Sequence, residues 1–350
     1  MVEGPGCTLN GERLRKGGII GQIVKLVVSK HADMQTLQGL QVNDVVTLGK
    51  ELFLFLAPPP PASCSLLRQQ QQDFSSGALG VISGVVCVRL HFGMNGSLTF
   101  NATTNRNKNN AKERYKKPIE NIVFQLHLSR DIVSVYQSTV CLRCPRRTRQ
   151  LIDKLARQDV CSPSFDVEAA SAALLAHARR HSAKEALLVD ALLDQTILPG
   201  SGNIIKNEAL FLAKVYPFLP SSSLTQAQAV ALVAHVRDFS LLFKRCRESG
   251  QSLSKHCNVY NRRACGSCGS IVRVCRAGND LARVTFCCTS CQPSPPEEPS
   301  AAPPASLLLQ RSIHAAEMLC AMSSCGKDSD YTPPPLPKRP LAGEHAGGAS

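Results

Sequence analysis

The pattern of hydrophobic and polar residues changes near the middle of the chain. In the first part, apolar residues come in short runs rich in Val, Ile and Phe, broken by Gly, Asn and Asp, which is typical of β-strands. These runs lie at 18–56, 85–100, 119–128 and 131–136. The pair Asn95-Gly96 predicts a hairpin turn inside the second run. We therefore expect antiparallel sheets in the first part of the chain.

After Pro145 the apolar residues recur at helical spacing, in the stretches 148–158, 168–195 and 225–249. The third stretch begins with Thr225 as a predicted N-cap, with Gln228 three residues later, and Gly250 follows its end. One face of this helix carries an apolar stripe that is expected to pack into a core: Val230, Val233, Val236, Phe239 and Phe243. The second part of the chain is therefore predicted to be helical.

Two segments have compositions that do not favour a packed core. Residues 57–83 contain a proline run, a glutamine run and a Gly/Ser tract, and residues 293–350 are rich in proline. We expect a disordered insertion and a disordered tail there. The remaining chain predicts an α+β protein with an antiparallel β-sandwich domain over 1–145, a helical domain over 146–256 and a cysteine-rich domain over 257–292.

Charge and composition narrow the classes of partner. The chain has 350 residues, 43% of them apolar, and a net charge of +14, which indicates a polyanionic partner such as nucleic acid or an acidic membrane surface. The uncharged stretch without proline at residues 74–88 is too short to span a bilayer, and the N-terminus lacks a secretory signal. We expect a soluble intracellular protein without membrane contact, in which the sixteen cysteines are thiols or metal ligands.

Four of these cysteines form two Cys-x-x-Cys pairs separated by nineteen residues, Cys265 with Cys268 and Cys288 with Cys291. This spacing is typical of a zinc ribbon, in which four thiolates hold one structural Zn²⁺ ion. Cys287 competes with Cys288, but only Cys288 keeps the two-residue spacing to Cys291. The sequence therefore predicts a structural zinc site.

Other features of this region are less specific. The pair Cys141 and Cys144 has no second pair at ribbon spacing, so we interpret it as a coincidence in a basic loop, and Cys275 as a bystander within a strand. The predicted ribbon hairpin carries several arginines, among them Arg283, and a single acidic residue, Asp280. Such a hairpin is suited to contact a phosphate backbone. A solvated charged hairpin without a ligand is the alternative.

A glycine-rich turn separates two helical patterns at residues 198–211. Pro199 and Gly200 are expected to end one helix, Gly202 permits a second tight turn, and Asn203 begins the next helix. Free backbone N–H groups at a helix start, together with the Asn203 amide, form an anion site. This arrangement predicts a clamp for one DNA phosphate.

The same turn resembles the helix–two-turn–helix of the Fpg/Nei family of DNA glycosylases, whose pattern is P-G-x-G-N-x-x-x-x-E-x-L-F. The positions that match are Pro199, Gly200, Gly202, Asn203, Glu208, Leu210 and Phe211. The opening of the chain and the cysteine pairs match the same family in the same order. The resemblance covers about residues 1–291, apart from the insertion at 57–83.

The resemblance gives a role to the opening letters MVEGPG. An N-terminus is ordinarily frayed and without function, but in this family the mature terminal amine is the nucleophile. Removal of Met1 would make it the amine of Val2, whose ordinary pKa of about 7.7–8.0 leaves far more neutral amine at pH 7 than a lysine with a pKa of about 10.4. Glu3 would then move protons, and Lys50 matches the family's strand lysine near the phosphate or base.

Two departures from the family pattern have consequences. Most relatives begin with proline, which forms an obligate iminium, whereas Val2 forms an imine that can lose its proton, so strand cleavage should be weak while base excision is kept. Met94 matches a residue that fills the void left by a flipped base, but residues 138–147 contain no matching Arg-x-Phe pair. Extrusion from intact duplex is then harder, which favours single-stranded substrate.

The resemblance thus implies a bifunctional DNA glycosylase and abasic-site lyase, monomeric and nuclear, with zinc as structural cofactor. Its expected substrates are hydantoins and oxidised pyrimidines in single-stranded or forked DNA, and certain interstrand crosslinks. Met94, Asn203 and Arg283 are the expected DNA contacts. Two other classes remain open. One is a non-catalytic zinc-ribbon DNA-binding protein, which has no need of Val2, Glu3 or Lys50; the other is an RNA-binding protein, favoured by charge alone.

Overall fold

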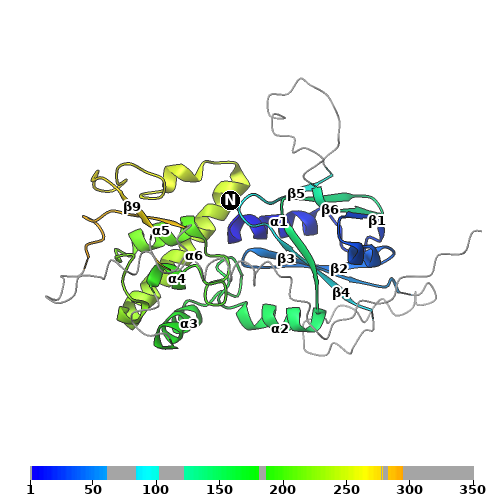
Figure 1. Ribbon diagram of the computed structural model, residues 1–350, viewed down its shortest axis with the longest axis horizontal. Coiled ribbons are helices and arrows are strands. Elements are labelled where there is room, and N and C mark those ends of the chain that lie inside the picture. Colours follow the sequence, from blue (N-terminus) through cyan, green and yellow to red (C-terminus); the bar gives the residue numbers. More distant parts are fainter. Residues whose placement is uncertain are drawn as a thin grey trace, which may run out of the picture.

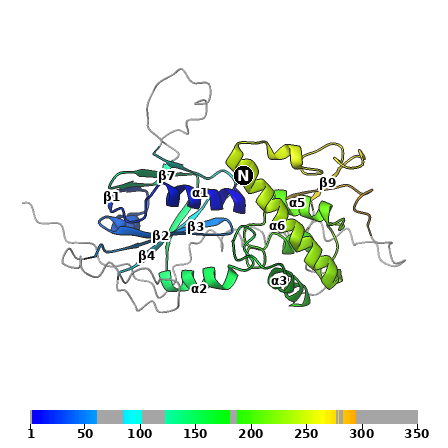
Figure 2. The same cartoon turned by 180° about the vertical axis from the view of Figure 1, so that it is seen from behind.

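The structure is a computed structural model that describes residues 2–60, 84–101, 122–180, 187–276, 278 and 283–294. It has two lobes (Figure 1), one with the sheets, α1 and α2, the other with α3 to α6 and β9, and the N-terminus lies between them. The view from behind shows the same separation (Figure 2). Most of the predicted insertion and nearly all of the predicted tail lie outside the described residues. Ala57, the first residue assigned to the insertion, is instead the last residue of a strand.

In the described part of the first lobe, two four-stranded antiparallel sheets face each other. In spatial order, one contains β1 (Val24–Ser29), β6 (Ile122–Leu128), β7 (Ile132–Tyr136) and β5 (Ser97–Phe100), and the other β2 (Gln41–Leu48), β3 (Glu51–Ala57), β4 (Val86–His91) and β8 (Thr139–Arg143). Alternating residues such as Leu52, Leu54 and Val88 from one sheet meet Phe124 and Val133 from the other in one core. The predicted β-sandwich is confirmed.

Two local predictions in this lobe are wrong. The turn at Asn95-Gly96 does not close a hairpin, because β4 pairs on both sides with β3 and β8, and β5 pairs with β7 in the other sheet. The turn, closed by the Gly96 N–H donating to the Phe92 carbonyl at 2.8 Å, instead carries the chain between sheets. The region of Cys141 is also no loop, since it forms the edge strand β8 and the thiol is buried.

Helix α1 (Gly4–Lys16) follows the N-terminus and has no counterpart among the sequence predictions. Pro5 stands in its first turn, where its missing N–H costs nothing, and its basic last turn suits the helix dipole. It buries Cys7, Gly11 and Leu14. Helix α2 (Pro145–Leu155) covers the outer face of the second sheet, where the Arg149 guanidinium lies 3.7 Å from the centre of the Phe55 ring.

The second lobe is built from helices, as the spacing predicts. They are α3 (Val167–Arg180), α4 (Leu188–Ala191), α5 (Asn203–Leu212) and α6 (Gln226–Ser249), and short 3₁₀ helices lie at η1 (Ala32–Leu37) in the first lobe, η5 (Ser221–Ser223) and η6 (Leu253–His256). The ends of α6 are those predicted: Thr225 and Gln228 form a capping box, and Gly250 adopts φ +69°.

A two-stranded sheet of β9 (Arg273–Arg276) and β10 (Val284–Cys287) follows the helices and packs against α5 through β10. Its small core holds Phe211, Val259 and Val272. Across the described ranges, no helix has both the length and the apolar character needed to cross a membrane.

Candidate functional site

The buried carboxylate of Glu3 lies at the start of α5, two hundred residues away in the sequence. Only 1% of Glu3 is exposed. Its Oε1 accepts the Ile204 N–H at 2.8 Å and its Oε2 accepts the Ile205 N–H at 3.3 Å. The anion held by these N–H groups is therefore the chain's own carboxylate, rather than the phosphate that the sequence suggested.

Burial raises the pKa of Glu3 above its ordinary value, because a carboxylate is poorly solvated in this position. The two backbone hydrogen bonds and the charges of Lys50 and Arg283 oppose that rise without cancelling it. A carboxyl group whose pKa is raised in this way is suited to give and take a proton.

Glycines allow three segments to touch through their main chains. The Gly4 N–H donates to the Gly200 carbonyl at 2.9 Å. A Cβ added at Gly4 would lie 2.7 Å from the Gly200 Cα, and one added at Gly49 would lie 2.6 Å from the Gly200 nitrogen. A Cβ on Gly202 would lie 2.3 Å from the Glu3 carboxyl carbon. The N-terminus, the β2–β3 turn and the double turn are therefore held together without intervening side chains.

The β2–β3 turn brings Lys50 to this junction. The Gly49 N–H donates to the buried carboxylate of Asp159 at 2.8 Å, and Asp159 also accepts the Cys161 N–H at 2.9 Å. Burial lowers the pKa of His91 and the charge of Lys50 lowers it further, while the same charge opposes the rise in the pKa of Glu3, so Lys50 acts on both side chains. Sequence reasoning missed Asp159 and His91. The position of His91 in the run HFGMNG, three residues before Met94, was the available signal for the histidine.

Met94 and Arg283 meet across the two lobes. Met94 is 51% exposed in the turn between β4 and β5, and its Sδ accepts the Arg283 Nη1–H at 3.2 Å. Arg283 directly precedes β10, and its charge also acts on Glu3. The two predicted DNA contacts thus lie together, next to the buried carboxylate.

Asn203 and Glu208 tie α5 to the segments that follow α6. The Asn203 amide donates to the Val284 carbonyl at 3.0 Å, which links the first residue of α5 to β10. Glu208 is fully buried, and its carboxylate accepts the N–H groups of Asn258, Val259 and Tyr260 at 2.7, 3.0 and 2.7 Å. Sequence reasoning recorded Glu208 only as part of a motif, and the structure gives it a positioning role.

A cavity of about 610 Å³ opens beside this network. Its lining includes Ile204, Leu253, Tyr260, Arg262 and Arg263. Ile204, one of the lining residues, also donates its backbone N–H to Glu3, which does not itself line the cavity. The lining combines apolar and aromatic side chains with Ser254, Asn261 and two arginines, a mixture that suits a flat, partly polar ligand.

The four thiols selected by their spacing lie together beyond α5. The Sγ atoms of Cys265, Cys268, Cys288 and Cys291 are all within 4.8 Å of one another, and Cys287 is not among them. Two of the separations are 4.0 and 3.5 Å. Four sulfurs at about 2.3 Å from a tetrahedral zinc ion would be ~3.8 Å apart. The cluster could therefore hold a metal ion such as zinc.

The helices and the N-terminal region both match known DNA glycosylase sequences. A family model described as the formamidopyrimidine-DNA glycosylase H2TH domain matches residues 162–254, which include α3 to α6. Endonuclease 8-like 3 of Homo sapiens is 34% identical, and that of Mus musculus 36% identical, over 85% of this chain. The chain belongs to the Fpg/Nei family. It spans about half the length of these curated relatives, 47% in both cases.

Solved structures of two other proteins share the fold. A viral DNA glycosylase has a TM-score of 0.64 at 19% identity and covers 83% of this chain, and MutM (Fpg) from Thermus thermophilus has a TM-score of 0.59 at 21% identity and covers 84%. All of each of those chains is covered. The shared fold therefore extends over both lobes, beyond the matched H2TH domain.

Proposed function

We propose that this Fpg/Nei protein is a DNA glycosylase that removes oxidised bases through a Schiff base on the α-amine of Val2. The observation that carries the proposal is the buried Glu3 carboxyl, next to residue 2, with Lys50 and Arg283 close enough to act on its pKa. The Glu3 carboxylate also holds the start of α5 through Ile204 and Ile205, but a non-catalytic DNA-binding protein does not require that group to lie beside the terminal amine together with Lys50. Val2 packs partly against the core of the first lobe, which fixes the position of its amine.

The proposed reaction begins when the neutral amine attacks C1′ of the damaged nucleotide. The bond from C1′ to the base breaks, the base leaves with a proton, and Glu3 protonates the ring oxygen as the sugar opens to an imine. Removal of a proton from C2′ then expels the 3′ phosphate, and water releases the sugar fragment from the amine. Lys50 lies where it can stabilise a phosphate beside the reacting sugar.

We place the flipped base in the cavity lined by Ile204 and Tyr260, since Ile204 connects its wall to Glu3 through the backbone hydrogen bond. Ile204 and Tyr260 provide apolar and aromatic surface, and Arg262 and Arg263 provide donors for the oxygens that oxidation adds to hydantoins and pyrimidines. Because Glu208 holds the N–H of Tyr260, the wall of this cavity is fixed to α5.

The preference for single-stranded or forked DNA follows from what can fill the void in a duplex. Met94 is exposed and is therefore accessible to fill such a void. The segment that would supply an Arg-x-Phe pair, residues 138–147, instead forms β8 and the first turn of α2. With Met94 alone to fill the void, the free energy lost by unstacking a base from duplex DNA is only partly recovered. We extend the proposal to the unhooking of interstrand crosslinks, a monomeric state, a nuclear location, and Zn²⁺ as the ion at the four thiols.

The test of this function is borohydride trapping on single-stranded DNA that contains an oxidised base. The mature protein should become covalently joined to the DNA, because borohydride reduces the imine. A zinc-ribbon protein that only binds DNA would give no covalent product. Competition by RNA oligomers as strong as that by DNA would favour the RNA-binding alternative instead.

Substitution of Val2 by proline should shift the balance between the two steps. The proline iminium cannot lose a proton and is a stronger electron sink, so strand cleavage should rise relative to base release, on the order of tenfold for ~1.4 kcal/mol of barrier. Gels run with and without alkali treatment measure the two products. Val2→Ala keeps a primary amine and should behave as the parent protein does. An equal ratio for Val2→Pro would contradict the imine explanation.

Loss of the Asn203 amide or the Arg283 guanidinium should weaken DNA binding by about 1–3 kcal/mol in each case, as for a charged hydrogen-bonded contact. The loss should be the same for damaged and undamaged strands, because phosphate contacts position the protein without reading the base. Asn203→Ala also removes the bond to Val284, so its melting temperature must be followed as a control. A loss confined to damaged DNA would show that these side chains read the lesion.

A further inference from the structure

A second cavity, of about 550 Å³, lies at the C-terminal end of α6. It and the cavity proposed for the base are both lined by residues of η6: His256 contributes to the second cavity, and Leu253 and Ser254 to the first. The two cavities are therefore neighbours that share one 3₁₀ turn. Nothing in the proposed reaction uses the second cavity.

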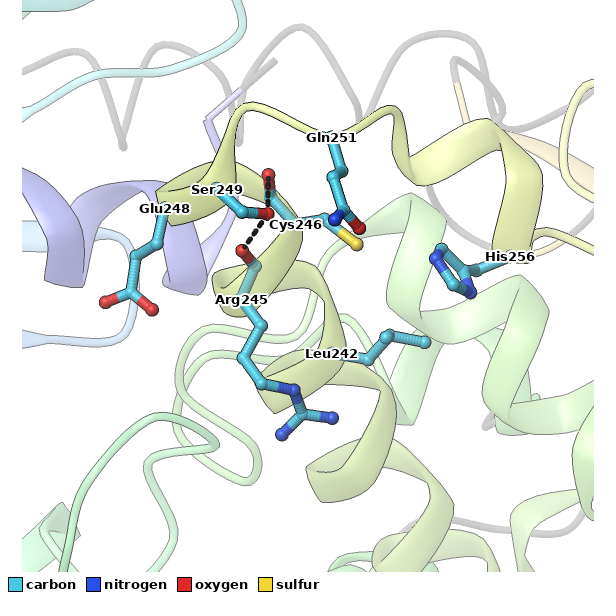
Figure 3. Close-up of a pocket in the computed structure, with 7 residues that line it drawn as sticks. All are labelled: Leu242, Arg245, Cys246, Glu248, Ser249, Gln251 and His256. Atoms are coloured by element: carbon cyan, nitrogen blue, oxygen red, sulfur yellow. Dashed lines mark hydrogen bonds between the residues drawn. The ribbon is translucent and has the colours of Figure 1, made fainter.

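The lining of this cavity combines a small apolar surface with polar groups. Leu242 and the buried Cys246 supply the apolar part, and Arg245, Gln251 and His256 supply a guanidinium, an amide and an imidazole. In Figure 3, Gln251 and His256 lie on either side of the Cys246 thiol. This combination suits a ligand with a flat ring and a phosphate, since arginine binds phosphate with two parallel donors.

The polar groups are available for a ligand. Among the described residues, the side chains of Arg245, Gln251 and His256 form no hydrogen bond or ion pair. The remaining polar side chains are engaged: the Ser249 hydroxyl donates to the Arg245 carbonyl at 2.9 Å, and the Glu248 carboxylate lies 3.7 Å from the Lys244 Nζ. In Figure 3 both the Glu248 carboxylate and the Arg245 guanidinium point away from Gln251 and His256.

The surrounding charge indicates a nucleic-acid strand. Residues 244–263, which supply most of the lining of both cavities, contain six Lys or Arg residues and one acidic residue, Glu248. A positively charged surface with binding sites for successive bases is typical of proteins that bind single-stranded nucleic acid. A strand that places one base in the first cavity would continue along this surface.

We propose that the second cavity binds a nucleotide that flanks the damaged one in the same DNA strand, with a phosphate at Arg245 and its base against Leu242, Cys246 and His256. Gln251 would contact the edge of that base. This proposal rests on the proposed function, because the first cavity must receive the damaged base. It makes Arg245 and His256 specificity-determining residues for single-stranded substrate.

The test measures the affinity of full-length protein for single-stranded oligonucleotides that carry a tetrahydrofuran abasic analogue and extend from it by increasing lengths on either side. Arg245→Ala should weaken binding about tenfold, the equivalent of one charged contact, for strands that extend past the analogue on one side. It should have no such effect when the strand ends there. His256→Ala should show the same dependence on length.

Arg247→Ala is the matched control. Arg247 lies on the same helix, is exposed and contributes the same charge, but it stacks on Phe243 at 5.3 Å and does not line the cavity. Its removal should weaken binding slightly and equally at all lengths. If Arg245→Ala and Arg247→Ala behave alike at every length while both variants keep the parent melting temperature, the cavity does not bind a nucleotide and the proposal is wrong.

Photocrosslinking identifies the strand. A 4-thiothymidine placed beside the analogue should crosslink to the peptide containing residues 242–256. Crosslinking only from the opposite strand of a fork would overturn the assignment to the same strand. Trapping by borohydride is measured separately. Normal trapping without the length effect would reject the nucleotide site in this cavity and leave the proposed glycosylase unaffected. A length effect without trapping would reject the proposed glycosylase and leave the nucleotide site supported.

Discussion

Blocking the terminal amine is expected to abolish base excision completely. Retention of Met1, or acetylation of Val2, removes the neutral amine from its place beside Glu3 and leaves the described contacts of the fold intact. Without that nucleophile no imine can form, and activity should fall to the background rate. The measurement is release of an oxidised base from single-stranded DNA together with borohydride trapping, on protein whose N-terminus has been verified by mass spectrometry.

Lys50 provides the control for this experiment because it is the rival amine at the site. Lys50→Ala should lower activity and still permit a trapped complex. Glu3→Gln should bind DNA and open the sugar poorly, since an amide cannot exchange the proton. If trapping persists with a blocked terminus and disappears with Lys50→Ala, the lysine is the nucleophile and the assignment to Val2 is wrong.

The second large effect concerns the four thiols. Cys265→Ser or Cys288→Ser should release the metal and abolish DNA binding, while the β-sandwich stays folded. The small core of this region, with Phe211, Val259 and Val272, buries too little apolar surface to hold it together. A structural zinc site in small domains supplies on the order of 10 kcal/mol of folding free energy. The small core of this region cannot offset the loss of that free energy, so the region should unfold.

Metal content by elemental analysis, DNA binding by gel shift and sheet content by circular dichroism would measure the three parts of this expectation. Cys287→Ser is the matched control, since Cys287 is buried beside the cluster without belonging to it. Metal loss on Cys287→Ser with retention on Cys288→Ser would reverse the choice of ligand.

The sequence predicted those strands and helices whose signals lie within a few neighbouring residues. The ends of α6 depend on Thr225, Gln228 and Gly250, each of which acts within one turn, and the structure has them as predicted. Helix α1 was missed because its first residues, Gly4 to Gly6, are typical of a turn. Its stability comes from burying Cys7 and Leu14 in the sandwich core, which no local pattern reveals.

The errors and omissions at the site have the same origin. Asn95-Gly96 correctly indicates a turn, but pairing of its flanking strands depends on which sheet edges are open. The start of α5 was correctly seen as suited to an anion, yet the anion is supplied by Glu3 from the other end of the chain. The contact between Met94 and Arg283 spans 189 positions and likewise depends on the tertiary fold.

The main-chain contacts between Gly4, Gly49 and Gly200 have a consequence for how such a protein can diversify. The site of the amine is determined by backbone geometry, whereas the walls of the two cavities come mostly from residues 242–264, on other segments. In the proposed enzyme, substitutions in those walls would alter which lesions are accepted without displacing the Val2 amine. Substrate range and reaction chemistry are therefore separable properties, free to evolve at different rates within one scaffold.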